Sequence, residues 1–255
     1  MTKCSEETIG LGRNVESIKG LKCLGTCKGE QTCSSRCFDK YGNPGLDGFL
    51  NCVLEREKCM PMPPSVTSGD ISDSSTFAVS PGFRNGMLEG RWFKVAGISD
   101  IYDMFDCQTN MLTIGDAKGV LGIEFRTRGE EGGYYSSSLK ESVDFTDEGK
   151  LRTEGSMYGL TFNERWTVVG GNSEVKGDVG RFWIIRYVGR TLQGEYEGGF
   201  VYGDSPRMNE ATRREVGKVW KETQGTEYEG KFKDIDNACD AVVGGKGELR
   251  KVSGG

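Results

Sequence analysis

From Gly90 onward the sequence repeats one pattern: a short segment rich in apolar and β-branched residues, followed by a turn that contains Gly, Asn or Asp. This pattern is typical of antiparallel strands joined by hairpins. Eight consecutive strands at hairpin spacing favour an up-and-down barrel, which pairs its own edges and can hold one small ligand. We therefore predict an all-β fold, an eight-stranded antiparallel barrel, with strands at 90–98, 107–114, 120–128, 134–145, 151–155, 160–169, 180–189 and 193–202.

A helix is predicted after the last strand. Ser205 suits the N-cap and Pro206 suits the first helical position. Apolar residues then recur at helical spacing up to Trp220. We expect a helix near 206–222 that packs against the outside of the barrel as a brace.

Composition divides the chain into four parts. Residues 1–60 hold seven of the nine cysteines, and residues 61–86 read as a linker rich in Pro, Ser, Asp and Gly. The barrel and its helix occupy 87–240. Residues 241–255 are expected to form a flexible tail.

The cysteine-rich segment contains two Cys-x3-Cys pairs, Cys23/Cys27 and Cys33/Cys37. A spacing of four puts both thiols of each pair on one helical face. Two short antiparallel helical stretches would then form nested bridges, Cys23–Cys37 outside and Cys27–Cys33 inside. Zinc ligation fits less well, because the spacing is x3 rather than x2 and no histidine is available. We therefore expect structural disulfides and no metal.

The remaining cysteines suggest two further bridges. Cys52 and Cys59 can close a small loop of their own, and Cys107 and Cys239 can tie the C-terminal segment to the barrel. Cys4 is then left over. So many cysteines indicate an oxidising compartment.

The sequence contains no histidine. Ser-His and Cys-His nucleophiles and His-ligated metal sites are therefore excluded, and acid–base chemistry must come from carboxylates, Tyr, Lys or Cys. The net charge of -5 argues against nucleic acid as a partner.

Several short motifs resemble those of one family. Gly90-Arg91-Trp92 matches the G-x-W signature of lipocalins, and residues 102–108 (YDMFDCQ) resemble the F-D-x-F-D-C-Q segment of violaxanthin de-epoxidases. The ends of the cysteine-rich segment, the stretches 187–190 and 198–202 and the segment 236–239 also match. Over roughly residues 20–240, the chain resembles the violaxanthin de-epoxidase family.

This resemblance implies a lipocalin-type barrel in the chloroplast thylakoid lumen. It implies a carotenoid as ligand or substrate, xanthophyll chemistry, and ascorbate as the reductant if the chain is a true de-epoxidase. It also supports the nested cysteine pairing. The thylakoid membrane surface, or a lumenal face of a photosynthetic complex, is a further expected partner.

The resemblance also assigns candidate catalytic residues: Tyr187, Arg126, Glu141 at the place of a family glutamine, and Arg165 at the place of the family's acidic residue. Arginine cannot donate a proton usefully. Glu164 is adjacent, but one step along a strand reverses the face unless a bulge intervenes. Alternation alone turns Arg165 to water, whereas the resemblance puts it inside the barrel, and the sequence leaves both readings open.

Alternation along 135–145 places Glu141 on an otherwise apolar face, where burial would raise its pKa. The aromatic residues Tyr134, Tyr135, Trp166, Trp183 and Phe200 are candidate ligand contacts, with core packing as the alternative for each.

Two functions remain. The first is an enzyme that converts epoxy-xanthophylls by de-epoxidation or isomerisation. The second is a non-catalytic lumenal subunit that binds pigment or acts as a scaffold. With Arg165 in place of the family's acid, ascorbate-dependent de-epoxidation is predicted to be absent or very weak.

Overall fold

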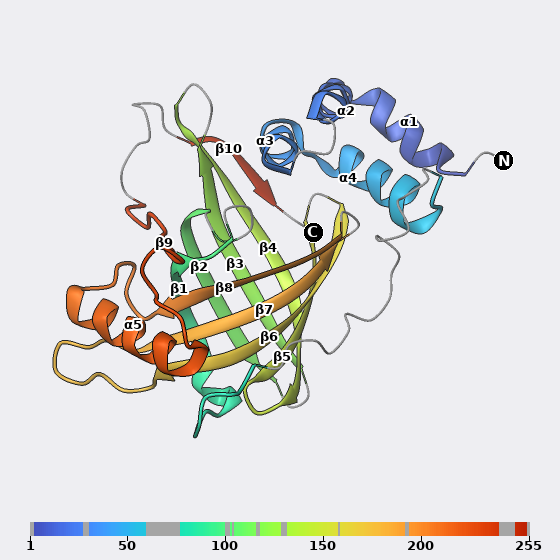
Figure 1. Ribbon diagram of the computed structural model, residues 1–255. Coiled ribbons are helices and arrows are strands. Elements are labelled where there is room, and N and C mark those ends of the chain that lie inside the picture. Colours follow the sequence, from blue (N-terminus) through green and yellow to red (C-terminus); the bar gives the residue numbers. More distant parts are fainter. Residues whose placement is uncertain are drawn as a thin grey trace.

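The computed structural model describes residues 3–27, 31–59, 77–99, 103, 105–115, 118–128, 132–157, 159–191, 194–239 and 248–253. A helical N-terminal unit lies beside one end of a barrel, and one further helix lies against the barrel's outside (Figure 1). Most of the predicted linker, 61–76, lies outside the described residues, as do 241–247 and 254–255 of the predicted tail. None of the described helices is long and apolar enough to cross a membrane.

The barrel is closed and antiparallel, as predicted. Each strand pairs with the next, and β1 also pairs with β8, so that the eight strands form a ring. The predicted strands agree with the observed ones to within about three residues at each end. The bounds are β1 Gly90–Gly97, β2 Asp106–Ile114, β3 Lys118–Arg128, β4 Tyr134–Asp147, β5 Lys150–Met157, β6 Leu160–Asn172, β7 Phe182–Thr191 and β8 Gly194–Gly203.

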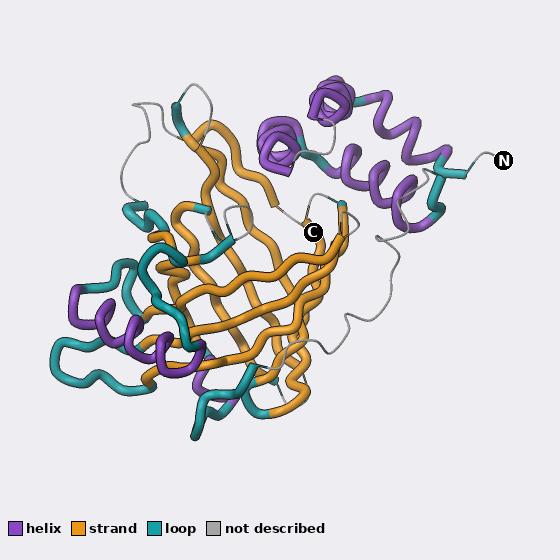
Figure 2. Tube along the Cα trace, in the orientation of Figure 1, coloured by secondary structure: helices purple, strands orange, loops and turns teal. Residues whose placement is uncertain are grey.

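Helix α5, Glu210–Gln224, packs on the outside of β6 and β7. Val216 and Trp220 are fully buried there against apolar side chains that point out of the barrel wall. The brace predicted from the sequence is therefore confirmed, and Figure 2 shows the helix outside the strands.

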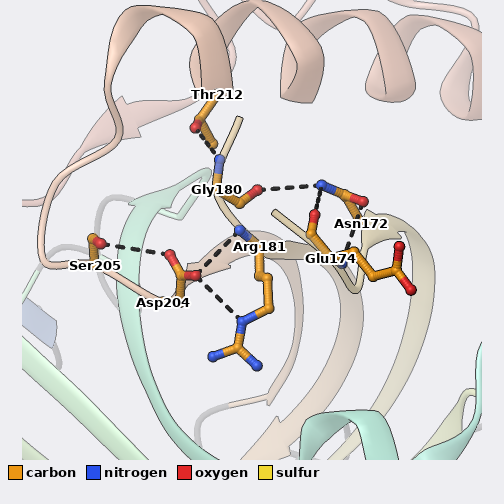
Figure 3. A network of polar contacts seen from close by, with 7 residues as sticks. All are labelled: Asn172, Glu174, Gly180, Arg181, Asp204, Ser205 and Thr212. Atoms are coloured by element: carbon orange, nitrogen blue, oxygen red, sulfur yellow. Dashed lines mark hydrogen bonds and ion pairs between the residues drawn. The ribbon is translucent and has the colours of Figure 1, made fainter. Parts of the chain in front are cut away.

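The predicted start of this helix is wrong. Asn209 is the N-cap, because its side-chain oxygen accepts a hydrogen bond from the Thr212 backbone amide at 2.8 Å. Its side-chain nitrogen donates to the Asp178 carbonyl at 2.7 Å. Ser205 and Pro206 lie in the preceding turn, where the Ser205 hydroxyl contacts Asp204 instead of capping the helix. Figure 3 shows how this turn and α5 are joined to the end of the β6–β7 loop. Asp204 of the turn accepts from Arg181, and the Gly180 amide donates to Thr212 of α5 at 2.9 Å.

One end of the barrel is filled by the segment before β1. Phe83, just before the 3-10 turn η3 (Asn85–Leu88), and Leu88, the last residue of that turn, belong to the core inside the barrel. The Trp92 indole donates to the Leu88 carbonyl at 2.9 Å, and the Arg181 guanidinium lies 5.4 Å from the centre of a Trp92 ring. Part of the predicted linker, from Phe77 on, thus packs against the barrel.

The N-terminal unit consists of α1 Ser5–Arg13, α2 Val15–Cys27, α3 Gln31–Tyr41, α4 Pro44–Leu50 and the π-helical turn η1 Asn51–Arg56. The nested disulfides Cys23–Cys37 and Cys27–Cys33 join α2 to α3, as predicted. The predicted Cys52–Cys59 bridge is wrong, because Cys52 bonds to Cys4. Cys4 and Cys52 are buried together, whereas Cys59 is exposed beyond η1 and forms no disulfide in the described part of the chain.

The predicted Cys107–Cys239 disulfide is also wrong for this structure, in which both are free thiols. They lie within hydrogen-bonding reach of each other. The C-terminal segment is held instead by hydrogen bonds, from the Cys107 amide to the Asp236 carbonyl and from the Gln108 amide to the Asn237 side chain. These bonds fix the segment against β2 without a covalent link.

The second end of the barrel carries the N-terminal unit. Glu55 accepts hydrogen bonds from the Thr161 amide and hydroxyl at the start of β6, and Leu160 packs against the helices' apolar cluster. Residues 248–253, within the predicted flexible tail, form strand β10 (Glu248–Ser253), parallel to the start of β4. The two-residue strand β9 (Lys233–Asp234) pairs with the end of β1.

Candidate active site in the barrel

The two ends of the barrel differ in how fully the inward side chains are covered. Phe83, Leu88 and Trp92 are buried at the end closed by η3. Toward the end that carries the N-terminal unit, the inward residues Phe162, Glu164 and Tyr196 are only partly covered. The interior is therefore less fully covered at that end, which we call the open end.

Strand β6 brings Glu164 into the interior. Its pairing with β5 and β7 is regular from Asn163 to Thr167, so that side chains alternate strictly. Trp166 belongs to the core inside the barrel, and Glu164, two residues away, shares its face. Arg165 is consequently on the outer face.

Both oxygens of Glu164 accept short hydrogen bonds. The Tyr196 hydroxyl donates to Oε1 at 2.6 Å, and the Trp166 indole N–H donates to Oε2 at 2.6 Å. Removal from bulk water raises the pKa of Glu164, while these two hydrogen bonds act in the opposite direction by favouring the charged form.

Glu141 reaches the same region from β4 and is buried. It stands opposite Gly155, where a Cβ would lie 2.9 Å from the Glu141 Cγ and 2.6 Å from the Phe162 ring, so the glycine makes room for both side chains. Burial, followed by the charge of Glu164, raises the pKa of Glu141 to about 8. Its Oε2 has no hydrogen-bond partner among the described residues.

The two glutamates thus occupy one electrostatic site, in which the charge of Glu164 opposes the ionisation of Glu141. Two neighbouring carboxyls that cannot both ionise provide an acid and a base at the same pH. At neutral and mildly acidic pH, Glu141 is the protonated member. This arrangement can donate a proton to one atom of a bound molecule and remove a proton from another.

Tyr187 lies on the inward side of β7, directly opposite Trp166 of β6. Its phenol is buried, and burial together with the charges of Asp103 and Glu164 raises its pKa well above the usual range, so it remains protonated. A Cβ at Gly198 would overlap this phenol, which means that the glycine permits its position.

A buried ion pair flanks Tyr187. The Lys94 ammonium lies 3.3 Å from Asp103 and 4.3 Å from the centre of the Phe200 ring. Asp103 is fully buried in the β1–β2 connection and also accepts from the Ser99 amide at 2.9 Å. Among the described residues, the interior near the open end therefore brings together the Lys94 ammonium, the carboxyls of Asp103, Glu141 and Glu164, and several phenols among aromatic rings.

Comparison with known proteins agrees with this architecture. The family model described as VDE lipocalin domain matches residues 1–237. The chain belongs to the VDE lipocalin domain family. Violaxanthin de-epoxidase of Spinacia oleracea is 26% identical over 245 residues, which cover 94% of this chain and 50% of that protein. Violaxanthin de-epoxidase of Arabidopsis thaliana is 27% identical over 243 residues, 92% of this chain and 51% of its own length. The chain spans about half the length of these relatives.

Among solved structures, insecticyanin from the tobacco hornworm Manduca sexta has a similar fold. The TM-score is 0.53 at 13% sequence identity, and the match covers 69% of this chain and 90% of insecticyanin. At this identity the likeness concerns the fold alone, and it confirms the predicted lipocalin-type barrel.

Not all of the residues assigned from the sequence lie together in this VDE lipocalin. Glu141, Tyr187, Trp166 and Phe200 line the same part of the interior, with the Trp166 and Phe200 rings 5.1 Å apart. Trp183 lies at the closed end, edge-to-face with Phe83.

Arg126 and Tyr134 lie at the rim of the open end. The Arg126 guanidinium stacks 4.1 Å from the Tyr134 ring and donates to the Cys239 carbonyl, so it anchors the C-terminal segment. Tyr135 shares the inward side of β4 with Glu141, close to the strand's first residue.

Sequence reasoning missed Glu164 and Tyr196 as site residues. The signal for Glu164 was present, because alternation along β6 places it on the face of Trp166. It was set aside in favour of the residue directly before the tryptophan.

Proposed function

We propose that this protein binds an epoxy-xanthophyll in its barrel and opens the epoxide with the Glu141–Glu164 pair. The observation that carries the proposal is the buried carboxyl of Glu141, whose pKa is raised to about 8 beside Glu164, which accepts hydrogen bonds from Tyr196 and Trp166. An epoxide is opened most readily when its oxygen receives a proton as the C–O bond breaks. General acid assistance of this kind contributes about 10²–10⁴ in rate.

The substrate class is supported by the surroundings of the pair. Trp166, Tyr187, Tyr196 and Phe200 form an aromatic wall around it, which suits the apolar end ring of a carotenoid. The named relatives are violaxanthin de-epoxidases, and violaxanthin is an epoxy-xanthophyll.

Two outcomes follow from the opened epoxide. In isomerisation, Glu141 gives its proton to the oxygen, Glu164 takes a proton from a carbon next to the broken C–O bond, and the freed electron pair forms a C=C bond. In de-epoxidation, the oxygen takes one proton from Glu141 and one from the co-substrate ascorbate and leaves as water. Ascorbate also supplies two electrons and the proton that restores Glu141, and becomes dehydroascorbate. In both outcomes the first proton comes from Glu141.

The location we propose is the chloroplast thylakoid lumen. The three disulfides suit an oxidising compartment, and the relatives are named as chloroplastic. A carotenoid is insoluble in water, so the thylakoid membrane surface is the proposed partner from which the ligand enters the open end.

The test is incubation of the folded, disulfide-intact chain with violaxanthin in lipid micelles at pH 5–7, with and without ascorbate. Chromatography and mass spectrometry identify the product. A product of unchanged mass without ascorbate indicates isomerisation, and loss of one oxygen only with ascorbate indicates de-epoxidation. Binding without conversion refutes the enzymatic proposal and favours a pigment-binding subunit, and absence of binding refutes both.

A further inference from the structure

The two glutamates differ in the donors that surround them, and this difference decides which of them carries the proton. An indole N–H can only donate, so the Glu164 oxygen that contacts Trp166 at 2.6 Å must accept. The second oxygen faces the Tyr196 hydroxyl, also at 2.6 Å. Two donors on one carboxyl stabilise its anion, because hydrogen bonds to a charged acceptor are about twice as strong as those between neutral groups.

Glu141 has weaker support, because one side-chain hydrogen bond, with Thr153, favours its charged form, against two at Glu164. It is more deeply buried than Glu164, and its Oε2 has no partner among the described residues. The titratable groups that face the pair are Lys94 on β1, Asp103 in the β1–β2 connection, Tyr187 on β7, and Tyr196 and Tyr202 on β8. The one cation in this set is already paired with Asp103. A negative charge on Glu141 would therefore be less well compensated than one on Glu164.

The wall of the barrel is shaped to place Tyr196. On β7, Gly189 stands directly opposite Tyr196, and a Cβ there would overlap the phenol ring. The ring lies across this glycine with its centre 6.0 Å from that of Tyr187. The hydroxyl thereby reaches from β8 across Gly189 of β7 to Glu164 on β6.

We propose that Tyr196 and Trp166 are positioning residues that keep Glu164 ionised and so leave Glu141 as the protonated member of the pair. This inference rests on the proposed function, since it fixes Glu141 as the acid and Glu164 as the base of that reaction. Neither Tyr196 nor Trp166 needs to touch the substrate for this role.

The first experiment is the pH dependence of turnover by the full chain carrying Tyr196→Phe. Activity requires Glu164 ionised and Glu141 protonated, so the rate is bell-shaped in pH. Loss of one hydrogen bond to the charged group should move the acidic limb upward by roughly one pH unit or more and leave the alkaline limb in place. Tyr228→Phe is the matched control, because this buried tyrosine lies outside the barrel wall and stacks on Phe232. It should leave both limbs unchanged.

A second substitution guards against a merely structural effect. Replacing Tyr196 with 3,5-difluorotyrosine keeps the ring and makes the hydroxyl a stronger donor. The acidic limb should then move downward, opposite to the phenylalanine variant. Movement in the same direction for both, or no movement for either, would overturn the proposal.

Infrared spectroscopy locates the proton without any turnover. The protonated-carboxyl C=O band that persists at neutral pH should vanish in Glu141→Gln and remain in Glu164→Gln. The reverse pattern overturns the assignment. If the unaltered chain converts no epoxy-xanthophyll, the proposed function fails, while this measurement still decides where the proton lies.

Discussion

Replacing Glu141 by Gln should stabilise the protein at alkaline pH. In the unfolded chain this carboxyl ionises near its ordinary pKa of 4.5, whereas in the folded chain it holds its proton up to about pH 8. Between these values the folded state binds more protons than the unfolded state. The free energy of unfolding therefore falls as the pH rises from about 4.5 to about 8.

The size of the effect follows from the two pKa values. Each tenfold change in an ionisation equilibrium is worth about 1.4 kcal/mol. Raising the pKa from 4.5 to about 8 thus removes at most about 5 kcal/mol of stability once the pH exceeds both values. Glutamine stays neutral and avoids this loss, so the variant should equal the parent near pH 4.5 and exceed it by a few kcal/mol at pH 8.

Urea denaturation followed by tryptophan fluorescence measures this difference, because Trp92, Trp166 and Trp183 lie in the core inside the barrel. Glu154→Gln is the matched control, since that glutamate is exposed on the outer side of β5. It should show no pH-dependent gain. A Glu141→Gln variant whose stability relative to the parent is the same at pH 5 and pH 8 would refute the buried, protonated Glu141.

Three further predictions concern the scaffold. Cys52→Ser should destabilise the N-terminal unit by about 4 kcal/mol in the chain-entropy model, because it opens a loop spanning 48 residues, while Cys59→Ser should change nothing; urea unfolding of the helices checks both. Asp103→Ala leaves the Lys94 charge unpaired in the interior and should lower the free energy of unfolding by about 3–5 kcal/mol. Asp144→Ala removes one member of the exposed pair with Lys118 and should lower it by under about 1 kcal/mol in the same assay. Gly198→Ala displaces the Tyr187 phenol and should lower stability by about 1–3 kcal/mol, whereas Gly122→Ala meets only ordinary contacts; thermal unfolding distinguishes them.

The barrel could be predicted from the sequence because its signal is local. Alternation recurs along the strands, most of the turns contain Gly, Asn or Asp, and each strand pairs with its neighbour in the chain. The start of α5 was misplaced because Ser205 and Asn209 are both good N-caps. The choice between them depends on the Asp178 carbonyl, which only the folded β6–β7 loop brings near Asn209.

The disulfides show the same difference between local signals, which the sequence reveals, and contacts that form only in the folded chain. Nested bridges between adjacent helices follow from spacing within one helical hairpin. The Cys4–Cys52 bond depends on how α1 packs against α4, which spacing does not encode. Strand β10 was missed for a similar reason, because it pairs with a strand more than 100 residues earlier.

In the site, alternation predicted the faces of Glu141, Glu164 and Arg165, and the regular register of β6 confirms that reading. The expectation of weak activity assumed that Arg165 took the acid's place inside the barrel. That premise is wrong, since Glu164 occupies the inward position. The hydrogen bond from Tyr196 to Glu164 could not be foreseen, because it joins side chains that are 32 residues apart in the sequence and lie on two strands that do not pair with each other.

The most direct test of the Glu141–Glu164 pair is one set of turnover measurements with violaxanthin near pH 6. The parent, Glu141→Gln, Glu164→Gln and Arg165→Gln are compared under identical conditions. Loss of the acid or the base should lower the rate by about 10²–10⁴, whereas Arg165→Gln, on the outer face, should convert the substrate like the parent. Full activity in either glutamate variant, together with loss of activity in Arg165→Gln, would contradict the account.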